Sequence, residues 1–256
     1  MVGQRGIGGS VLLLVVLIWG GGEGRALAQQ QSLPSSPASS EPRFCADAAS
    51  AHRSLDVRGL GLVYCTTTPG LTAPLRGAHA TARPVFYSAV PAAWVRAGIT
   101  QDQSSVAAAY RLTVTQGLTL GLVVGTKHAV GRSRPYVDHP LAARADRHTP
   151  PAPGEAHLSF PSGHTGLSAA LVTSWSLSYP RWYVIGPGAL WATGVALSRV
   201  YLGVHYPSDV LAGAVLGIGL ALLVHQLRGL VTPPSLRASS GAQQVRAAPL
   251  VLRIQF

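Results

Sequence analysis

Apolar segments of helical length recur along this chain, and none shows the pattern of a strand. Gly, Ala and Leu dominate the last four of the five segments, and no segment alternates apolar with polar residues as a half-buried strand does. Small residues let helix backbones approach closely, so we predict an all-α fold, a bundle of about five or six helices. The segments are Pro84–Gly98, Ser104–Thr126, His164–Tyr179, Trp182–Tyr201 and Ser208–Leu227.

The number and sign of the charged residues limit the kinds of molecule that we expect this protein to bind. Charged residues make up 11% of the chain and hydrophobic residues 47%, whereas about 25% of residues are charged in ordinary soluble domains. This composition favours a membrane protein or an unusually apolar bundle. The formal net charge is +11, yet the basic residues are scattered and do not interleave with aromatic residues. We therefore expect anionic lipid head groups or phosphorylated substrates as partners, and no nucleic acid.

Whether the helices cross a bilayer stays open at this point. Only Ser208–Leu227 approaches the roughly 20 apolar residues that a span requires, and the other segments suit buried core helices as well. A cytoplasmic end for this helix would place Arg228, Arg237, Arg246 and Arg253 inside, as the positive-inside rule prefers. An integral membrane protein of the bacterial inner membrane and a soluble periplasmic bundle are both compatible with the sequence.

The amino terminus resembles a secretory signal. A basic residue, Arg5, precedes the apolar stretch Val11–Trp19, and Ala26-Leu27-Ala28 supplies small residues two apart. We expect cleavage after Ala28, with an uncleaved anchor as the alternative. The predicted organisation is a signal peptide over residues 1–28, an exported segment over 29–82, a helical core over 83–229 and a basic tail over 230–256.

Export changes the interpretation of the two cysteines, Cys45 and Cys65. Both lie in the exported part, where an oxidising compartment favours a disulfide between them. Two unpaired buried thiols are the alternative, and neither cysteine has the surroundings of a catalytic one.

Three short runs carry the residues that suit phosphate chemistry. The residues in them that we single out for this chemistry are three cations, two histidines and a carboxylate, and one of the cations is the single lysine of the chain. A transferring phosphoryl group has peripheral oxygens that need cations and hydrogen-bond donors. The runs are Lys127 to Arg134-Pro135, then Pro161-Ser162-Gly163-His164, and finally Ser198-Arg199 followed by His205 and Asp209.

Each run can be interpreted as part of a catalytic site or as a purely structural feature. On a helix His205 and Asp209 would share a face, so that the carboxylate could prepare the imidazole as a nucleophile or base. Ser162 resembles a helix cap, where free N–H groups favour an anion and Gly163 allows close approach. His164 could then give a proton to a leaving oxygen. Taken singly, a His–Asp pair is more often structural, and a capped helix can contain a histidine without any function.

The three runs together resemble the signature of the type 2 phosphatidic acid phosphatase and vanadium haloperoxidase superfamily. That signature has a lysine, six residues and Arg-Pro; then Pro-Ser-Gly-His; then Ser-Arg, five residues, His, three residues and Asp. Every position is matched here, and the resemblance covers about residues 84–228.

The resemblance implies a helical bundle with the active site at one end and hydrolysis of a phosphomonoester or diphosphate, expected to be that of a lipid, without metal or cofactor. It implies that His205 attacks phosphorus to form a phosphohistidine, that Asp209 orients His205, and that His164 protonates the leaving group. The residues that would hold the phosphate are Lys127, Arg134, Ser162, Gly163 and Arg199.

Several alternatives remain. One is a soluble periplasmic nonspecific acid phosphatase, another is a vanadium-dependent haloperoxidase, and a third is a lipid-binding membrane protein without activity. Histidines at 139, 148 and 157 precede the second run, but their spacing matches no common zinc site, so we predict no metal.

Overall fold

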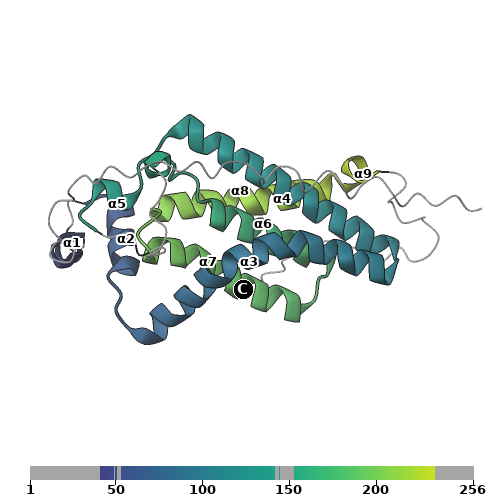
Figure 1. Ribbon diagram of the computed structural model, residues 1–256, viewed down its shortest axis with the longest axis horizontal. Coiled ribbons are helices and arrows are strands. Elements are labelled where there is room, and N and C mark those ends of the chain that lie inside the picture. Colours follow the sequence, from purple (N-terminus) through teal and green to yellow (C-terminus); the bar gives the residue numbers. More distant parts are fainter. Residues whose placement is uncertain (1–40, 49, 51–52, 142–143, 145–152, 234–256) are drawn as a thin grey trace, which may run out of the picture. The chain divides into compact units, whose positions relative to one another are not determined.

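The structure is a computed structural model, and it describes residues 41–48, 50, 53–141, 144 and 153–233. The predicted signal segment, the leader up to residue 40 and the tail beyond residue 233 lie outside these residues. The described residues contain helices and no strand, so the predicted all-α class is confirmed. The long helices are α3 (Pro69–Thr100), α4 (Gln103–Val130), α6 (Gly163–Ser178), α7 (Trp182–Tyr201) and α8 (Pro207–Gln226); the short ones are α1 (Glu41–Ala48), α2 (Leu55–Tyr64), α5 (Pro135–Asp138), the 3₁₀ helix η2 (Pro153–His157) and α9 (Arg228–Val231) (Figure 1).

Local signals set the ends of α4. The Asp102 carboxylate accepts a hydrogen bond from the Ser105 N–H at 2.7 Å and so caps the helix start. Gly131 ends the helix with a φ of 61°, a left-handed conformation that glycine adopts without strain. The helix therefore delivers Lys127 in its last turn and releases the chain just before Arg132.

Helix α3 begins at Pro69, well before the predicted start at Pro84, and α1 and α2 occupy a stretch in which the sequence shows no clear period. Three prolines inside α3, Pro74, Pro84 and Pro91, obscure the helical pattern, because an internal proline normally breaks a helix. Tertiary packing compensates: α3 packs against α4 and α7, and its small buried residues include Ala82, Ala93 and Ala97. The domain boundary at residue 82 stays a prediction.

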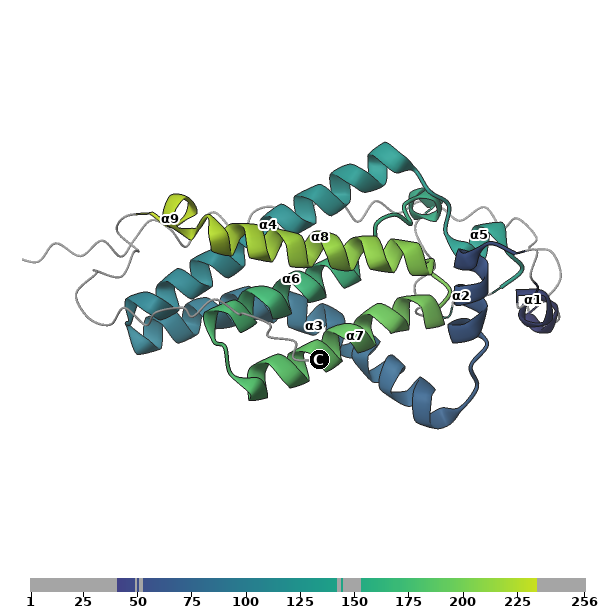
Figure 2. The same cartoon turned by 180° about the vertical axis from the view of Figure 1, so that it is seen from behind.

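Helices α6 and α8 touch through their backbones. A Cβ added at Gly213 would lie 2.4 Å from the Ser162 carbonyl oxygen, and one at Gly217 would lie 2.2 Å from the Gly166 carbonyl oxygen. Only glycine fits at such distances. Figure 2 shows α8 running alongside α6. This contact fixes the start of α6, where the second run begins, beside the first turns of α8.

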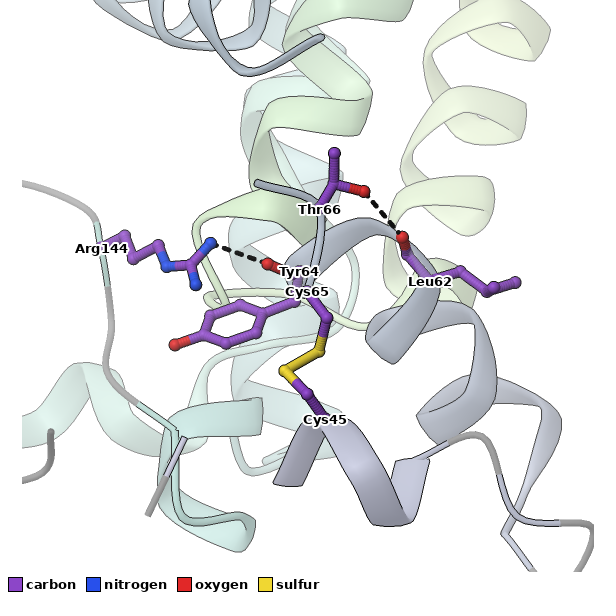
Figure 3. The surroundings of a disulfide bond; sticks show 6 residues. All are labelled: Cys45, Leu62, Tyr64, Cys65, Thr66 and Arg144. Atoms are coloured by element: carbon purple, nitrogen blue, oxygen red, sulfur yellow. Dashed lines mark hydrogen bonds between the residues drawn. A yellow bond between two sulfur atoms is a disulfide. The ribbon is translucent and has the colours of Figure 1, made fainter. Parts of the chain in front are cut away.

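The disulfide between Cys45 and Cys65 joins α1 to the end of α2 (Figure 3). Helix α2 also packs against α7 and α8, and its buried Leu60 and Tyr64 belong to a cluster that includes Tyr206. The N-terminal helices are thus attached to the part of the bundle where α7 ends and α8 begins.

Among the described residues, α8 is the helix with the length and apolarity to cross a bilayer. Its mean hydropathy is 1.9, and only 28% of its most apolar 18-residue window is buried, so it does not resemble the central helix of a soluble bundle. The large apolar side chains that α8 exposes are Leu211, Val215, Ile218, Leu222 and Leu223.

Candidate active site

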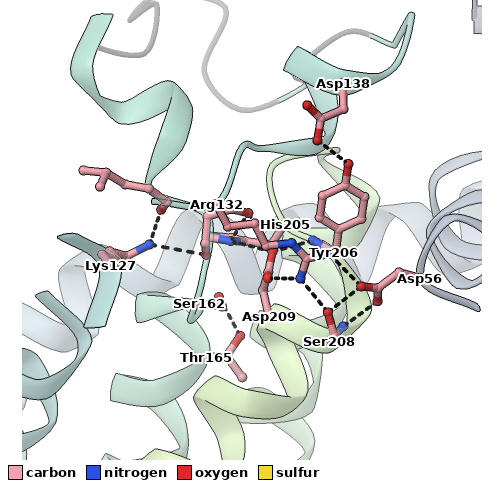
Figure 4. Close-up of polar contacts among 12 residues, drawn as sticks. Asp56, Lys127, Arg132, Asp138, Ser162, Thr165, His205, Tyr206, Ser208 and Asp209 are labelled. Carbon is pink, nitrogen blue, oxygen red and sulfur yellow. Dashed lines mark hydrogen bonds and ion pairs between the residues drawn. The ribbon is translucent and has the colours of Figure 1, made fainter. Parts of the chain in front are cut away.

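The fold brings the three runs together at the end of the bundle where α4, α7 and the start of α8 meet. Main-chain bonds join the runs directly. The Ser162 N–H donates to the Asp209 carbonyl at 2.9 Å, and the Ser159 N–H donates to the Arg132 carbonyl at 2.9 Å. Figure 4 shows Lys127, Ser162, His205 and Asp209 in one region.

His205 and Asp209 are bridged by a third residue, Ser159. The Nδ1 atom of His205 lies 3.7 Å from Oδ2 of Asp209, too far for a hydrogen bond. Ser159 donates its hydroxyl proton to Asp209 Oδ2 at 2.6 Å, and its Oγ lies 3.3 Å from His205 Nδ1. The direct hydrogen bond expected from their spacing is absent because His205 precedes the helix: α8 starts only at Pro207.

His205 is held in its neutral form. Its side chain is buried, and burial, together with the nearby cations Lys127, Arg134 and Arg199, lowers the pKa of the imidazole to about 3 against the raising effect of the Asp209 carboxylate. Because Ser159 gives its own proton to Asp209, its oxygen can accept the Nδ1–H of His205. The lone pair then lies on Nε2, which is the arrangement that a nucleophilic imidazole requires.

Two buried nitrogen atoms near this group have no hydrogen-bond partner among the described residues. They are Nε2 of His164 and Nε of Arg134. Buried polar atoms are normally paired, so unpaired ones suit a site that receives a polar ligand. The His164 ring also packs edge-on against Phe86 of α3, with 5.7 Å between ring centroids. Arg134 has a distant ion pair with Glu155 at 3.8 Å.

The other cations are held in different ways. Arg199 is buried in the last turn of α7, and its Nη2 lies 3.1 Å from Nδ1 of His79 on α3. Lys127 donates to the carbonyl oxygens of Leu158 and Ser159. An ammonium group has three donors, so one donor of Lys127 remains for a phosphate oxygen.

The start of α6 differs in one detail from the expected cap. Ser162 occupies the N-cap position, but its side chain makes no capping bond; its Oγ lies 3.0 Å from Oγ1 of Thr165. Gly163 is tightly surrounded, since an added Cβ would lie 3.3 Å from a methyl group of Val123 and 4.0 Å from the Lys127 side chain. The Gly163 backbone is therefore close to Lys127.

Four residues of this region were not predicted as site residues: Asp56, His79, Arg132 and Ser159. Ser159 stands two residues before the second run and Arg132 lies inside the first, so both carried a positional signal. Asp56 and His79 precede the predicted core, and nothing in the sequence links Asp56 to Ser208, 152 positions later, which it contacts. A groove of about 910 Å³ borders Asp56 and Arg132, and none of the predicted phosphate-binding residues lines it.

Of the histidines at 139, 148 and 157, the two that the structure describes have different surroundings. His157 Nδ1 lies 3.0 Å from the Ser133 hydroxyl, His139 packs against Phe44 and Tyr206, and His148 is outside the described residues. Within the described part of the chain, no group of three His, Cys, Asp or Glu side chains is arranged to hold a metal ion.

Curated relatives are similar to part of the chain. A lipid A 1-phosphatase of Rhizobium etli is 36% identical over 115 residues, which cover 44% of this chain and 46% of that protein. A decaprenylphosphoryl-5-phosphoribose phosphatase of Mycobacterium tuberculosis is 39% identical over 111 residues, covering 42% of this chain and 54% of that protein. The chain thus spans about half the length of the curated relatives it matches.

Solved structures share the fold. The crystal structure of Aquifex aeolicus LpxE has a TM-score of 0.53 and 21% identity, covering 68% of this chain and 97% of that chain. A transmembrane PAP2 type phosphatidylglycerolphosphate phosphatase from Bacillus subtilis has a TM-score of 0.50 and 22% identity, covering 75% and 96%. The family model of the PAP2 superfamily matches residues 108–232. Those residues contain all three runs, and they form a PAP2 superfamily domain.

Proposed function

We propose that this protein is a phosphatase that hydrolyses a phosphomonoester or diphosphate of a lipid through a phosphohistidine. The observation that carries the proposal is the buried, neutral His205, backed by Ser159 and Asp209 on its Nδ1 side and placed among Lys127, Arg134 and Arg199. The matched relatives, which by name remove phosphate from lipid A and from a decaprenyl-linked ribose phosphate, support the same reaction class.

In the first half of the proposed reaction, Nε2 of His205 attacks phosphorus. The bond from phosphorus to the leaving oxygen breaks, and His164 gives a proton to that oxygen. Burial and the nearby Arg199 lower the pKa of His164, so the negative charge of the bound phosphate must raise this pKa for the step. The imidazole of His205 gains positive charge as the new bond forms, and the carboxylate of Asp209 stabilises it through Ser159. Lys127, Arg134 and Arg199 neutralise the peripheral phosphate oxygens. These are the cations that such a site needs in place of a metal.

In the second half, a water molecule attacks the phosphohistidine. His164, neutral after the first step, accepts a proton from that water, the nitrogen–phosphorus bond breaks, and inorganic phosphate leaves. His205 returns to its neutral form, and His164 is protonated again for the next cycle. The unpartnered Nε2 of His164 is the atom that would carry this proton.

We further propose that the protein acts at a membrane, in the bacterial cell envelope with the site on the periplasmic side. The exposed apolar residues of α8 support insertion of this helix, and α4 and α7 also expose large apolar side chains. A lipid substrate would then reach the site from the bilayer. The large apolar side chains exposed on α4 and α7 include Leu118, Leu120, Leu122, Val124, Ile185, Leu190 and Leu197.

Phosphate release from defined lipids tests the activity. The detergent-purified protein is incubated with phosphatidic acid, a prenyl diphosphate and p-nitrophenyl phosphate, with and without a chelator. We expect release from at least one lipid, unaffected by the chelator and absent in His205→Ala. His128→Ala is the matched control, because this histidine is exposed and only contacts its own helix. Activity that survives His205→Ala would exclude the proposed nucleophile.

Fractionation tests the location. We expect the protein to stay with membranes through carbonate and high-salt washes and to leave them only in detergent. Release by salt or carbonate, together with hydrolysis of p-nitrophenyl phosphate in preference to lipids, would instead identify a soluble periplasmic acid phosphatase.

A further inference from the structure

The Asp209 carboxylate is held at both of its oxygens. Oδ2 accepts hydrogen bonds from Ser159 and from the Tyr206 N–H, the latter at 2.9 Å. Oδ1 lies 2.6 Å from Nη1 of Arg132, in an ion pair in which the Asp209 side chain is completely buried. Arg132 therefore fixes the rotation of the carboxylate, so that Oδ2 faces Ser159 and, beyond it, His205.

Arg132 is itself held on three sides. Its Nη2 lies 2.7 Å from Oδ2 of Asp56, its Nη1 lies 2.7 Å from the Ser208 hydroxyl, and its guanidinium carbon lies 4.3 Å from the centre of the Tyr206 ring. A planar guanidinium can bind two carboxylates at once, which a lysine ammonium cannot do with the same geometry. One side chain thus connects Asp209 to Asp56 on α2.

Asp56 joins this arginine to the start of α8. Its Oδ1 accepts the Ser208 N–H at 2.9 Å and its Oδ2 accepts the Ser208 hydroxyl at 2.5 Å (Figure 4). Burial raises the pKa of the Asp56 carboxyl, but the hydrogen bonds from Arg132 and Ser208 outweigh it and leave the pKa below its ordinary value. The ionised carboxylate also lies at a helix N-terminus, where a negative charge is favourable.

The chain of contacts ends at a reacting group. An ion pair that only stabilised the fold would not need to involve the carboxylate beside the proposed nucleophile. Arg132 and Asp56 line the groove, and both Nη atoms of Arg132 are already engaged by carboxylates and by the Ser208 hydroxyl, which leaves the guanidinium poorly placed to hold a phosphate. We propose that Arg132 and Asp56 are positioning residues that set the orientation of Asp209, and that through it they govern the rate at which His205 attacks. This inference rests on the proposed function.

A double-mutant cycle tests the inference, with single-turnover formation of the phosphoenzyme as the readout. Arg132→Gln should lower kcat at least about tenfold, because a charged hydrogen bond to Asp209 is lost, and should leave KM nearly unchanged. In an Asp209→Asn background the same change should lower kcat by less than about twofold, because Arg132 can then no longer act through the Asp209 carboxylate. Arg132→Lys should restore little of the rate.

Asp56→Asn extends the cycle and is the milder change. It should lower kcat less than Arg132→Gln does and should have no further effect once Arg132 is glutamine. Asp47→Asn is the matched control: this aspartate is exposed and paired only with Arg53, so its loss should leave kcat unchanged. If Arg132→Gln does not fold, a cycle of Asp56→Asn with Asp209→Asn tests in the same way whether the effect on kcat passes through Asp209.

Two results would overturn the inference. Losses that multiply independently in the Asp209→Asn background would show that Arg132 does not act through Asp209, and a rise in KM with constant kcat would make it a substrate contact. Both differ from failure of the proposed function, in which the wild-type protein itself releases no phosphate from any lipid and the inference falls with it.

Discussion

Ser159 donates its hydroxyl proton to Asp209 over 2.6 Å, so a serine and not the carboxylate is the group nearest to Nδ1 of His205. The proposed nucleophile His205 and the Asp209 carboxylate are thus joined through an inserted hydroxyl. Three groups in one line share the charge that develops on the imidazole, and each must keep its place for the others to work.

Removing this hydroxyl should slow the attack. We expect Ser159→Ala to lower kcat roughly ten- to a hundredfold, the cost of a hydrogen bond to a charged group, with KM little changed. Ser133→Ala is the control, since Ser133 bonds only to the exposed His157. Full activity of Ser159→Ala in a phosphate-release assay would show that His205 and Asp209 meet directly during the reaction.

Replacing the single lysine by arginine should be more damaging than a conserved charge suggests. Lys127 holds the carbonyl oxygens of Leu158 and Ser159, beside the tightly packed Gly163. A larger planar guanidinium would displace this segment, and a shift of about 1 Å can cost on the order of a hundredfold in rate. Steady-state kinetics of Lys127→Arg measure the loss, with Arg58→Lys, at an exposed position of α2, as the control. More than half of the wild-type kcat would refute this role.

Acid should destabilise the folded protein through His205. Its pKa is about 3 in the fold and 6.5 as the ordinary value, so the unfolded chain binds more protons between these pH values. Stability therefore falls as the pH drops below about 6.5, by about 1.4 kcal/mol for each unit of pKa difference. Thermal unfolding of wild type and His205→Gln at pH 7 and pH 4 measures this: the variant should lose less Tm. Equal losses in the two proteins would contradict it.

Because α6 and α8 touch through their backbones, we expect replacement of glycine by alanine to have opposite effects on stability at two positions of α8. Gly217→Ala must push α8 away from Gly166 and should cost at least about 1–3 kcal/mol of unfolding free energy. Gly219→Ala meets no atom within 4 Å and should stabilise the helix by about 0.5–1 kcal/mol. Denaturant unfolding of both variants gives the sign, and destabilisation by Gly219→Ala would be inconsistent with this packing.

Sequence patterns predicted the structure well where it depends on neighbouring residues. The bounds of α7 agree with those predicted, and α6 and α8 differ by about one residue, because apolar composition and clear boundaries mark them. The three runs carry their residue types and spacing in the chain itself. Their meeting in one region could be expected only from the family signature.

The remaining features depend on contacts between distant residues. The early start of α3 is supported by packing against α4 and α7, despite three internal prolines. The role of Ser159 depends on a difference of tenths of an ångström between two distances, from His205 Nδ1 to Ser159 Oγ and from His205 Nδ1 to Asp209 Oδ2. Asp56 reaches Ser208 across 152 positions, and an exposed-looking aspartate at a helix start gives no sign of such a partner.

Helix α3 precedes residues 108–232, which match the family, yet it places Phe86 against His164 and His79 against Arg199. The reacting groups and part of their surroundings are therefore encoded in separate stretches of the chain. Substitutions along α3 can reshape the space beside the proposed proton donor, His164, while every residue of the three runs stays the same. Two proteins with identical runs can thus differ in the leaving groups they accept, and comparing α3 sequences is the direct way to sort them.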